Sequence, residues 1–234
     1  ETSYAVVPLY RDSGSTKTFR YHQLDSRGIY DDTQTKINDW LDLQNISSFE
    51  ARSYVLNGNL SSGVNGYTDV VTNHSGGAIV ERLIGSFDGS GNSISDISFN
   101  DSNTSFYLFG TVDGGVVTNL NVNYGTVVCD RGGSVFNSTG NATITNISVD
   151  ASIDGSDVSA LIYFCNAGTV VNDCSIEGSI DGSTAGGVVH TIYVPDSGLS
   201  GDITIDNCDV EVDIVSSNAG SEIVHTIDRV PQVS

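Results

Sequence analysis

The chain has 234 residues, of which 38% are hydrophobic and 16% are charged, and its formal net charge is −20. So acidic a protein repels nucleic acids and anionic membranes, and no apolar run is long enough to cross a bilayer, so we expect neither a nucleic-acid partner nor membrane insertion. The chain contains no methionine, even at its first position, and we interpret it as the processed form of an exported protein.

An apolar, β-prone segment, TSYAVVPLYR, occupies residues 2–11 and is followed by a long polar stretch. We therefore expect residues 1–30 to form an N-terminal extension and residues 31–234 to form one domain. The apolar segment can fold back on its own domain, or it can add a strand to a neighbouring molecule. The residues expected to make that assembly contact are Tyr4, Val6, Val7, Leu9 and Tyr10.

Residues 33–44, TQTKINDWLDLQ, form the strongest helix candidate of the chain. Their apolar residues recur at helical spacing, and Asp31, Asp32 and Thr33 supply N-cap chemistry. A short amphipathic helix before a run of strands is suited to closing an open end of a stack. We therefore expect a capping helix here.

The rest of the chain repeats itself. Five segments share one pattern: SISDISF (93–99), VVTNLNV (116–122), TITNISV (143–149), VVNDCSI (170–176) and ITIDNCDV (203–210). Their alignment predicts three columns of apolar residues. The first column contains Ile94, Val117, Ile144, Val171 and Ile205; the second contains Ile97, Leu120, Ile147, Cys174 and Cys208; the third contains Phe99, Val122, Val149, Ile176 and Val210.

A second set of segments lies between the first: YLFGTV (107–112), SVFNST (134–139), LIYFCNAG (161–168), VVHTIY (188–193) and IVHTID (223–228). Turn-rich links separate the segments, and helical periodicity is absent. The pattern predicts an all-β fold, a right-handed parallel β-helix with stacked coils, in preference to a β-sandwich. His190 and His225 then occupy equivalent positions of successive coils, and we interpret them as a stacked pair rather than a metal site.

The run IGSFDGSGNSISDISF…YLFGTVDGGVVTNLNV resembles the GLUG-repeat family of microbial surface proteins. The family's opening F-x-G-x-G-x-x-I-x-x-L is matched by Phe87, Gly89, Gly91, Ile94 and Ile97. Its L-F-G element is matched by Leu108, Phe109 and Gly110, and its N-L or N-C element by Asn119-Leu120, Asn146-Ile147 and Asp173-Cys174. The resemblance covers residues 33–228 and implies a β-helical surface module, adhesin segment or stalk without catalytic residues. Later repeats depart from it, because Asn137 and His190 replace the Gly of L-F-G.

The sequence offers little support for chemistry at a site. Its acidic residues are scattered through turns, so we expect neither catalytic residues nor a metal site, although some β-helical enzymes cleave polysaccharides. The stretch DGSGNSISD (88–96) places oxygen ligands at alternate positions, and Ca²⁺ is retained there as an alternative. It lacks the terminal glutamate and the spacing of an EF-hand.

Two kinds of covalent modification are predicted. N-x-S/T sequons occur at Asn45, Asn59, Asn73, Asn100, Asn103, Asn137, Asn141 and Asn146, and they suggest a glycosylated, exported protein. Cys174 and Cys208 share a column, at a spacing within disulfide range, which leaves Cys129 and Cys165 as the second pair by elimination. Core packing of free thiols is the alternative for Cys174 and Cys208.

These observations predict an extracellular, non-enzymatic structural subunit. It is expected to assemble with copies of itself into a filament or surface layer, through its N-terminal strand and an open end of the solenoid. The alternative is an adhesin stalk or viral spike that binds glycans, which a row of exposed aromatic residues would support; Tyr107, Tyr124 and Tyr163 are candidates. A third reading is an enzyme that acts on polysaccharides.

Overall fold

The computed structural model describes residues 34–48, 51–195, 202–221 and 223–230. Apart from Gln34, these belong to one compact unit, Thr35–Ser234. The expected assembly segment, with Tyr4 and Leu9, lies outside the described residues, as does the expected domain boundary after residue 30. No helix among the described residues has the length and apolarity needed to cross a membrane.

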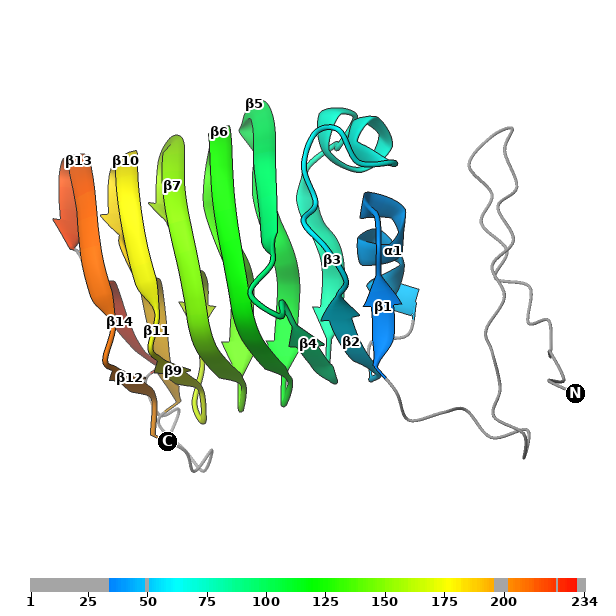
Figure 1. The fold of residues 1–234 in the computed structure, drawn as a ribbon. Coiled ribbons are helices and arrows are strands. Elements are labelled where there is room, and N and C mark those ends of the chain that lie inside the picture. Colours follow the sequence, from blue (N-terminus) through cyan, green and yellow to red (C-terminus); the bar gives the residue numbers. More distant parts are fainter. Residues whose placement is uncertain (1–33, 49–50, 196–201, 222, 231–234) are drawn as a thin grey trace, which may run out of the picture. The chain divides into compact units, whose positions relative to one another are not determined.

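The chain forms a β-solenoid of parallel, stacked coils (Figure 1). Parallel pairing joins each coil to the coils before and after it, as predicted. The strands are β1 (Thr35–Ile37), β2 (Ser53–Leu56), β3 (Gly77–Leu83), β4 (Ser86–Asp88), β5 (Ser93–Asp113), β6 (Val116–Gly140), β7 (Thr143–Ser159), β8 (Ile162–Cys165), β9 (Val170–Asn172), β10 (Ser175–Gly186), β11 (Val189–Pro195), β12 (Thr204–Asp206), β13 (Asp209–Ser221) and β14 (Val224–Val230). Successive coils are β2–β3, β4–β5, β6, β7–β8, β9–β11 and β12–β14.

Short helices cover the β1 end of the stack (Figure 1). They are α1 (Trp40–Gln44), a 3₁₀-helix (Asn45–Ser48) and a π-helix (Thr68–Thr72). Trp40, Leu43 and Ile46 are completely buried, so this end of the apolar interior is closed.

The expected helix over residues 33–44 is wrong in its first half. Thr35–Ile37 is a strand that pairs with β2, and the helix begins only at Trp40. Asp39 is the N-cap, with its carboxylate accepting a hydrogen bond from the backbone N–H of Asp42 at 2.8 Å. Helical spacing of apolar residues therefore did not distinguish a buried strand followed by one helical turn from a single helix.

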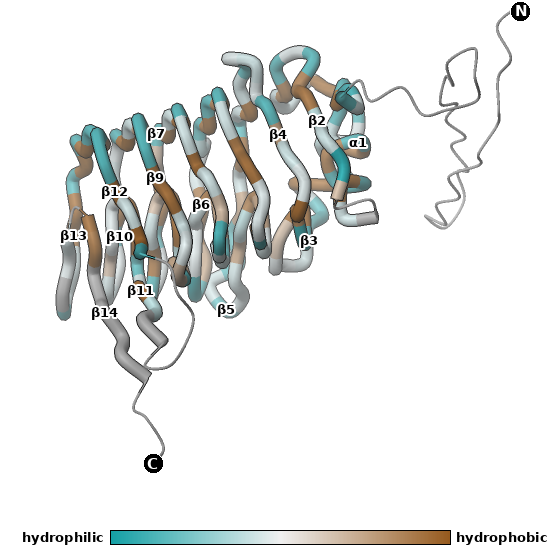
Figure 2. The backbone as a smooth tube through the Cα atoms, turned by 90° about the horizontal axis from the view of Figure 1, so that it is seen from below, coloured by the Kyte–Doolittle hydropathy of each residue, from teal (hydrophilic) through white to brown (hydrophobic). Residues whose placement is uncertain are grey.

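Most of the predicted interior columns are confirmed by the strand register. Val117, Ile144, Val171 and Ile205 lie side by side on successive coils, and Val122, Val149, Ile176 and Val210 do the same. Apart from the two members in the last coil, these side chains are at most 2% exposed. Figure 2 shows apolar stretches recurring at the same place from coil to coil.

The β4–β5 coil departs from the predicted alignment. Phe87, rather than Ile94, is the partner of Val117, and Ile94 instead pairs with Val122. The turn after β4 explains the difference, because Ser90 and Gly91 adopt positive φ angles of 52° and 73° and form the corner of this coil. The segment SISDISF therefore begins beyond the corner, whereas its supposed counterparts begin before it.

A ladder of polar side chains marks the same corner in the later coils. Asn119, Asn146, Asp173 and Asn207 have φ angles of 55°, 54°, 53° and 49°. Asn and Asp tolerate this left-handed conformation better than other non-glycine residues do. Asn146 donates its amide to Asn119 Oδ1 at 2.8 Å, and Asn207 donates to Asp173 Oδ1. The N-L and N-C elements of the sequence are therefore turns that are stacked from one coil to the next.

Candidate functional site

The coil formed by β12, β13 and β14 ends the stack of described strands. Each of its strands pairs with one neighbour only: β12 with β9, β13 with β10 and β14 with β11. Within the described residues, the opposite edge of this coil has no paired strand. An uncovered edge of a parallel sheet exposes a row of backbone N–H and C=O groups that can pair with another chain.

The apolar interior is also uncovered at this edge. Ile205, Val210 and Ile214 are only partly buried. In the preceding coil their partners Val171, Ile176 and Ile180 are at most 1% exposed. Val215 and Ile223 beside them are 61% and 52% exposed. We call the surface formed by β12–β14 and Ile223 the open edge; it combines these apolar side chains with backbone groups that have no paired strand within the described residues.

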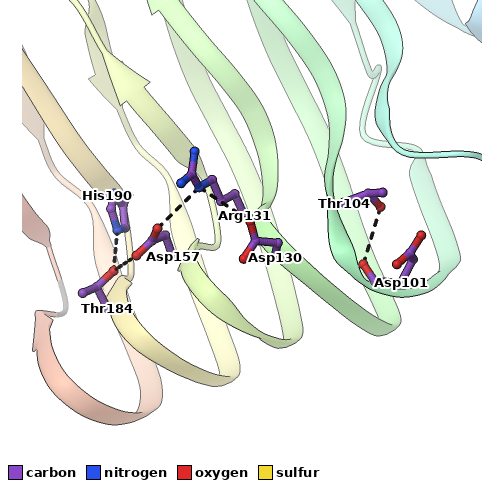
Figure 3. Close-up of polar contacts among 7 residues, drawn as sticks. All are labelled: Asp101, Thr104, Asp130, Arg131, Asp157, Thr184 and His190. Atoms are coloured by element: carbon purple, nitrogen blue, oxygen red, sulfur yellow. Dashed lines mark hydrogen bonds and ion pairs between the residues drawn. The ribbon is translucent and has the colours of Figure 1, made fainter.

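A second feature is a polar chain that crosses several coils (Figure 3). The Arg131 guanidinium lies 3.6 Å from the Asp157 carboxylate and 3.7 Å from that of Asp130. Thr184 donates a hydrogen bond to Asp157 Oδ1 at 2.6 Å, and its hydroxyl lies 3.0 Å from His190 Nε2. We call these residues the polar chain; they join β6, β7, β10 and β11.

The pairing of Val189 with Val224 and of Thr191 with Thr226 places His225 opposite His190 on the next coil, as predicted. His190 itself is 7% exposed and stacks on Tyr163 with ring centroids 4.8 Å apart. Its Nδ1 lies 2.9 Å from the Thr191 hydroxyl. Both ring nitrogens of His190 therefore have partners within the protein, as expected of a histidine with a structural role.

The tyrosines proposed as an exposed row do not form one. Tyr107, Tyr124 and Tyr163 are 6%, 3% and 5% exposed. Burial raises the pKa of all three phenols, and that of Tyr107 reaches about 12. These three tyrosines therefore offer no exposed platform for a ligand.

The four cysteines are free thiols in the structure, so neither predicted disulfide is present. The neighbouring pairs of β9 with β12 and of β10 with β13 place Cys174 beside Cys208, as the column predicted. Cys129 instead pairs with Asp101 and Gly155, and Cys165 with Thr139 and Ile192. Cys129 and Cys165 are thus in different columns, and pairing them by elimination was wrong.

Most of the predicted glycosylation sites have exposed side chains. The exposed asparagines are Asn59, Asn73, Asn100, Asn103, Asn141 and Asn146, while Asn45 and Asn137 are half-buried. The Asn146 amide takes part in the corner ladder described above. The Asn103 amide likewise donates to Asp101 Oδ1 at 3.3 Å, so Asn59, Asn73, Asn100 and Asn141 fit a glycan most readily.

The carboxylates of the stretch 88–96 have structural partners. Asp88 Oδ1 accepts hydrogen bonds from the Ser90 N–H at 2.8 Å and from the Asn119 amide at 3.0 Å. Asp96 Oδ2 accepts from the N–H and hydroxyl of Ser62 at 3.0 and 2.8 Å, and these bonds lower the pKa of Asp96. Within the described residues, no group of three or more His, Cys, Asp or Glu side chains is placed to hold a metal ion.

A pocket of about 530 Å³ lies between the π-helix and the neighbouring coils. Val71 and Thr72 come from the π-helix, His74 from the loop after it, and Phe99 and Asp101 from β5. Sequence reasoning missed this site, because its walls come from segments that share no motif. A signal that could have drawn attention to it was the sequons at Asn73 and Asn100, which both lie beside it.

No family model matches the chain, and neither the curated proteins nor the solved structures contain a significant match.

Proposed function

We propose that this protein is an extracellular, glycosylated structural subunit that assembles with copies of itself into a filament or surface layer. Residues 2–10 of one copy would add a strand to the open edge of the next. The proposal assigns no catalytic role to the chain. The observation that carries it is the open edge, where half-buried apolar side chains lie beside backbone groups that have no paired strand within the described part of the chain.

The N-terminal segment has the composition that the open edge requires. Tyr4, Val6, Val7, Leu9 and Tyr10 are β-prone, and a strand added to a sheet gains backbone hydrogen bonds while its alternate side chains fill apolar pockets. Its nine residues can extend over about 30 Å. That length covers about two thirds of β13, whose 13 residues extend over about 43 Å.

Charge also favours docking of the N-terminal segment on the open edge. Residues 1–30 contain more cations than acids: Arg11, Lys17, Arg20 and Arg27 against Glu1, Asp12 and Asp25. The chain as a whole carries −20, and the open-edge strand β13 exposes Asp209, Glu211 and Asp213. Two acidic coils repel one another when they approach directly, whereas the extension approaches an acidic edge without that penalty.

The test compares the full chain with a variant that lacks residues 1–10, by electron microscopy and analytical ultracentrifugation at several concentrations. We expect filaments or sheets from the full chain and dispersed rods from the truncated one. A synthetic peptide of residues 1–11 should bind the truncated protein in a one-to-one ratio. Assemblies that persist after truncation would contradict the proposal that residues 2–10 dock as a strand.

A pair of substitutions tests the acceptor side. Val212→Asp places a charge in the half-buried interior of the open edge, and we expect it to abolish assembly and peptide binding. Val170→Asp places the same charge on an exposed valine of β9, on the side of the stack. We expect Val170→Asp to assemble normally, and circular dichroism should show both variants folded.

A second candidate function is a non-catalytic adhesin stalk or spike module that binds glycans, and the pocket is the observation that favours it. Dispersed rods from both the full and the truncated chain, together with glycan binding by a stable monomer, would support this function over self-assembly.

A further inference from the structure

The pocket has the size and form of a ligand site. Its volume of about 530 Å³ lies within the range of about 300–1,000 Å³ that is typical for small-molecule sites. Its walls come from the π-helix, the loop after it, and strands β5 and β6. Segments separated by many residues in the sequence therefore converge on one cavity.

The residues that line the pocket include both apolar and neutral hydrogen-bonding groups. Tyr67 is a half-buried aromatic residue, Val71 and Phe99 are 1% and 6% exposed, and Thr72, Ser98 and Thr126 contribute hydroxyls. A sugar ring combines the same two kinds of surface, because its C–H groups form an apolar face and its rim carries hydroxyls. Aromatic and aliphatic side chains can pack on that face, while hydroxyl, amide and carboxylate groups bond the rim.

The charge of the pocket favours a neutral ligand. Asp101 is its one carboxylate, and none of the described residues that line it is Lys or Arg. Burial lowers the pKa of His74, so its ring is neutral near pH 7. An anionic sugar would meet a carboxylate without a compensating cation, within a protein of net charge −20.

His74 is held in a fixed orientation by its neighbours. Its ring meets those of Phe99 and Phe106 edge-on, with centroids 6.1 and 5.6 Å apart. Its Nε2 lies 3.4 Å from the Gly77 carbonyl, a contact in which the nitrogen donates. In that tautomer Nδ1 is an acceptor and can receive a hydrogen bond from a ligand hydroxyl.

We propose that this pocket binds a neutral pyranose ring, with the apolar face of the sugar on the half-buried Tyr67 and its hydroxyls on Asp101, Thr72 and His74. Two kinds of glycan can supply such a ring. Asn100 is itself part of the pocket wall and begins the sequon Asn-Asp-Ser, so a glycan attached there can fold into the cavity. The other source is an external glycan. The attached glycan rests on the glycosylation proposed above, whereas binding of an external glycan does not.

The first arm of the test uses protein produced without N-glycans, so that the pocket is accessible. N-acetylglucosamine, glucose, galactose and mannose are titrated by saturation-transfer NMR and calorimetry, with sialic acid as the anionic comparison. We expect at least one neutral sugar to bind and sialic acid to bind at least about tenfold more weakly. Failure of all four neutral sugars to bind would overturn the proposal.

Matched variants locate the binding. Thr126 is exposed at the pocket, and Thr126→Trp should fill the cavity and weaken sugar binding by at least about tenfold. Ser179→Trp makes a similar change at an exposed strand position outside the pocket and should leave binding within about twofold. His74→Phe keeps the aromatic contacts but removes the ring nitrogens, and it should also weaken binding. Equal binding by Thr126→Trp and the parent would overturn the proposal.

The second arm separates the two sources in glycosylated protein. Ser102→Ala removes the sequon but keeps Asn100 in the wall. If the glycan on Asn100 fills the pocket, the glycosylated parent will not bind free sugar and Ser102→Ala will bind it. If the ligand is external, both will bind. Assembly through the open edge is scored separately on the same variants, so failure of one proposal does not imply failure of the other.

Discussion

At the scale of single residues, the corners of the coils determine which amino acids are accepted. Asn146 has a φ angle of 54°, a region that costs a Cβ-bearing residue about 1–2 kcal/mol and that glycine enters freely. Its amide also bonds Asn119. Conformation and hydrogen bonding can therefore be separated by two substitutions at one position.

We expect Asn146→Ala to lower the free energy of unfolding by about 2 kcal/mol, because it adds backbone strain to a lost hydrogen bond. Asn146→Gly loses only the hydrogen bond and should cost about 1 kcal/mol. Urea unfolding of protein without N-glycans measures both. Equal losses in the two variants would show that the left-handed corner contributes no strain.

A buried phenol offers a second residue-level test. Tyr124 is 3% exposed, and its hydroxyl has no hydrogen-bond partner among the described residues. Tyr124→Phe removes the unsatisfied group, and we expect it to raise the free energy of unfolding by about 1 kcal/mol. Tyr107→Phe is the control, because the Tyr107 hydroxyl bonds Ser105, and it should lower stability instead. A loss of stability in Tyr124→Phe would contradict the assignment.

The thiols differ in the bond that they can form. Under oxidising conditions we expect a disulfide between Cys174 and Cys208, which stabilises the fold by about 4 kcal/mol by closing a loop of about 35 residues. Burial raises the pKa of the Cys129 and Cys174 thiols alike, to about 12, so the register rather than the pKa distinguishes them. Cys129 and Cys165 lie in different columns, so we expect both to remain reduced.

Peptide mapping by mass spectrometry after alkylation identifies the bond, and Cys208→Ser is the control that should yield no disulfide. A peptide linking Cys129 to Cys165 would contradict the strand register.

At the scale of elements, the polar chain adds side-chain contacts between coils that are otherwise joined by backbone hydrogen bonds. Thr184 is its central link, because its hydroxyl contacts both Asp157 and His190. Thr184→Val keeps the shape but removes the hydroxyl that contacts both Asp157 and His190, and we expect the free energy of unfolding to fall by about 1–3 kcal/mol.

Thr184→Ser retains the hydroxyl and should lose less than about 1 kcal/mol of stability. Thermal unfolding of the two variants provides the comparison. Equal stability of Thr184→Val and the parent would show that the polar chain does not brace the coils.

Elements also show how far the sequence could predict this structure. The apolar columns that contain Val117 and Val122 were predictable, because parallel coils place like residues side by side. The register of Ile94 was not, because an alternating apolar pattern fits two alignments and only the corner at Ser90 chooses between them. The pocket was least predictable, since its walls come from a π-helix and two coils that share no pattern.

At the scale of the whole molecule, charge opposes compact folding. Asp150, Glu177 and Glu211 lie opposite one another on β7, β10 and β13. Like charges on neighbouring strands repel one another, and salt screens them. We expect the midpoint of thermal unfolding to rise between about 10 mM and about 1 M NaCl, over which the Debye length falls from about 30 Å to about 3 Å.

Glu177→Gln, at the centre of this row, should raise stability at low salt and reduce the salt dependence. Glu81→Gln removes an exposed charge from β3, outside the row, and should have a smaller effect. Equal effects of the two substitutions would attribute the salt dependence to net charge alone rather than to the stacked carboxylates.

The closed β1 end and the stacking of coils in chain order have a consequence for biogenesis. The helices that seal the interior precede most of the coils in the sequence, so they are available first when the chain leaves a ribosome or a secretion channel. Each finished coil then presents a template on which the next one can dock, without waiting for distant segments. Folding can therefore advance in one direction, from the closed end towards the last coil.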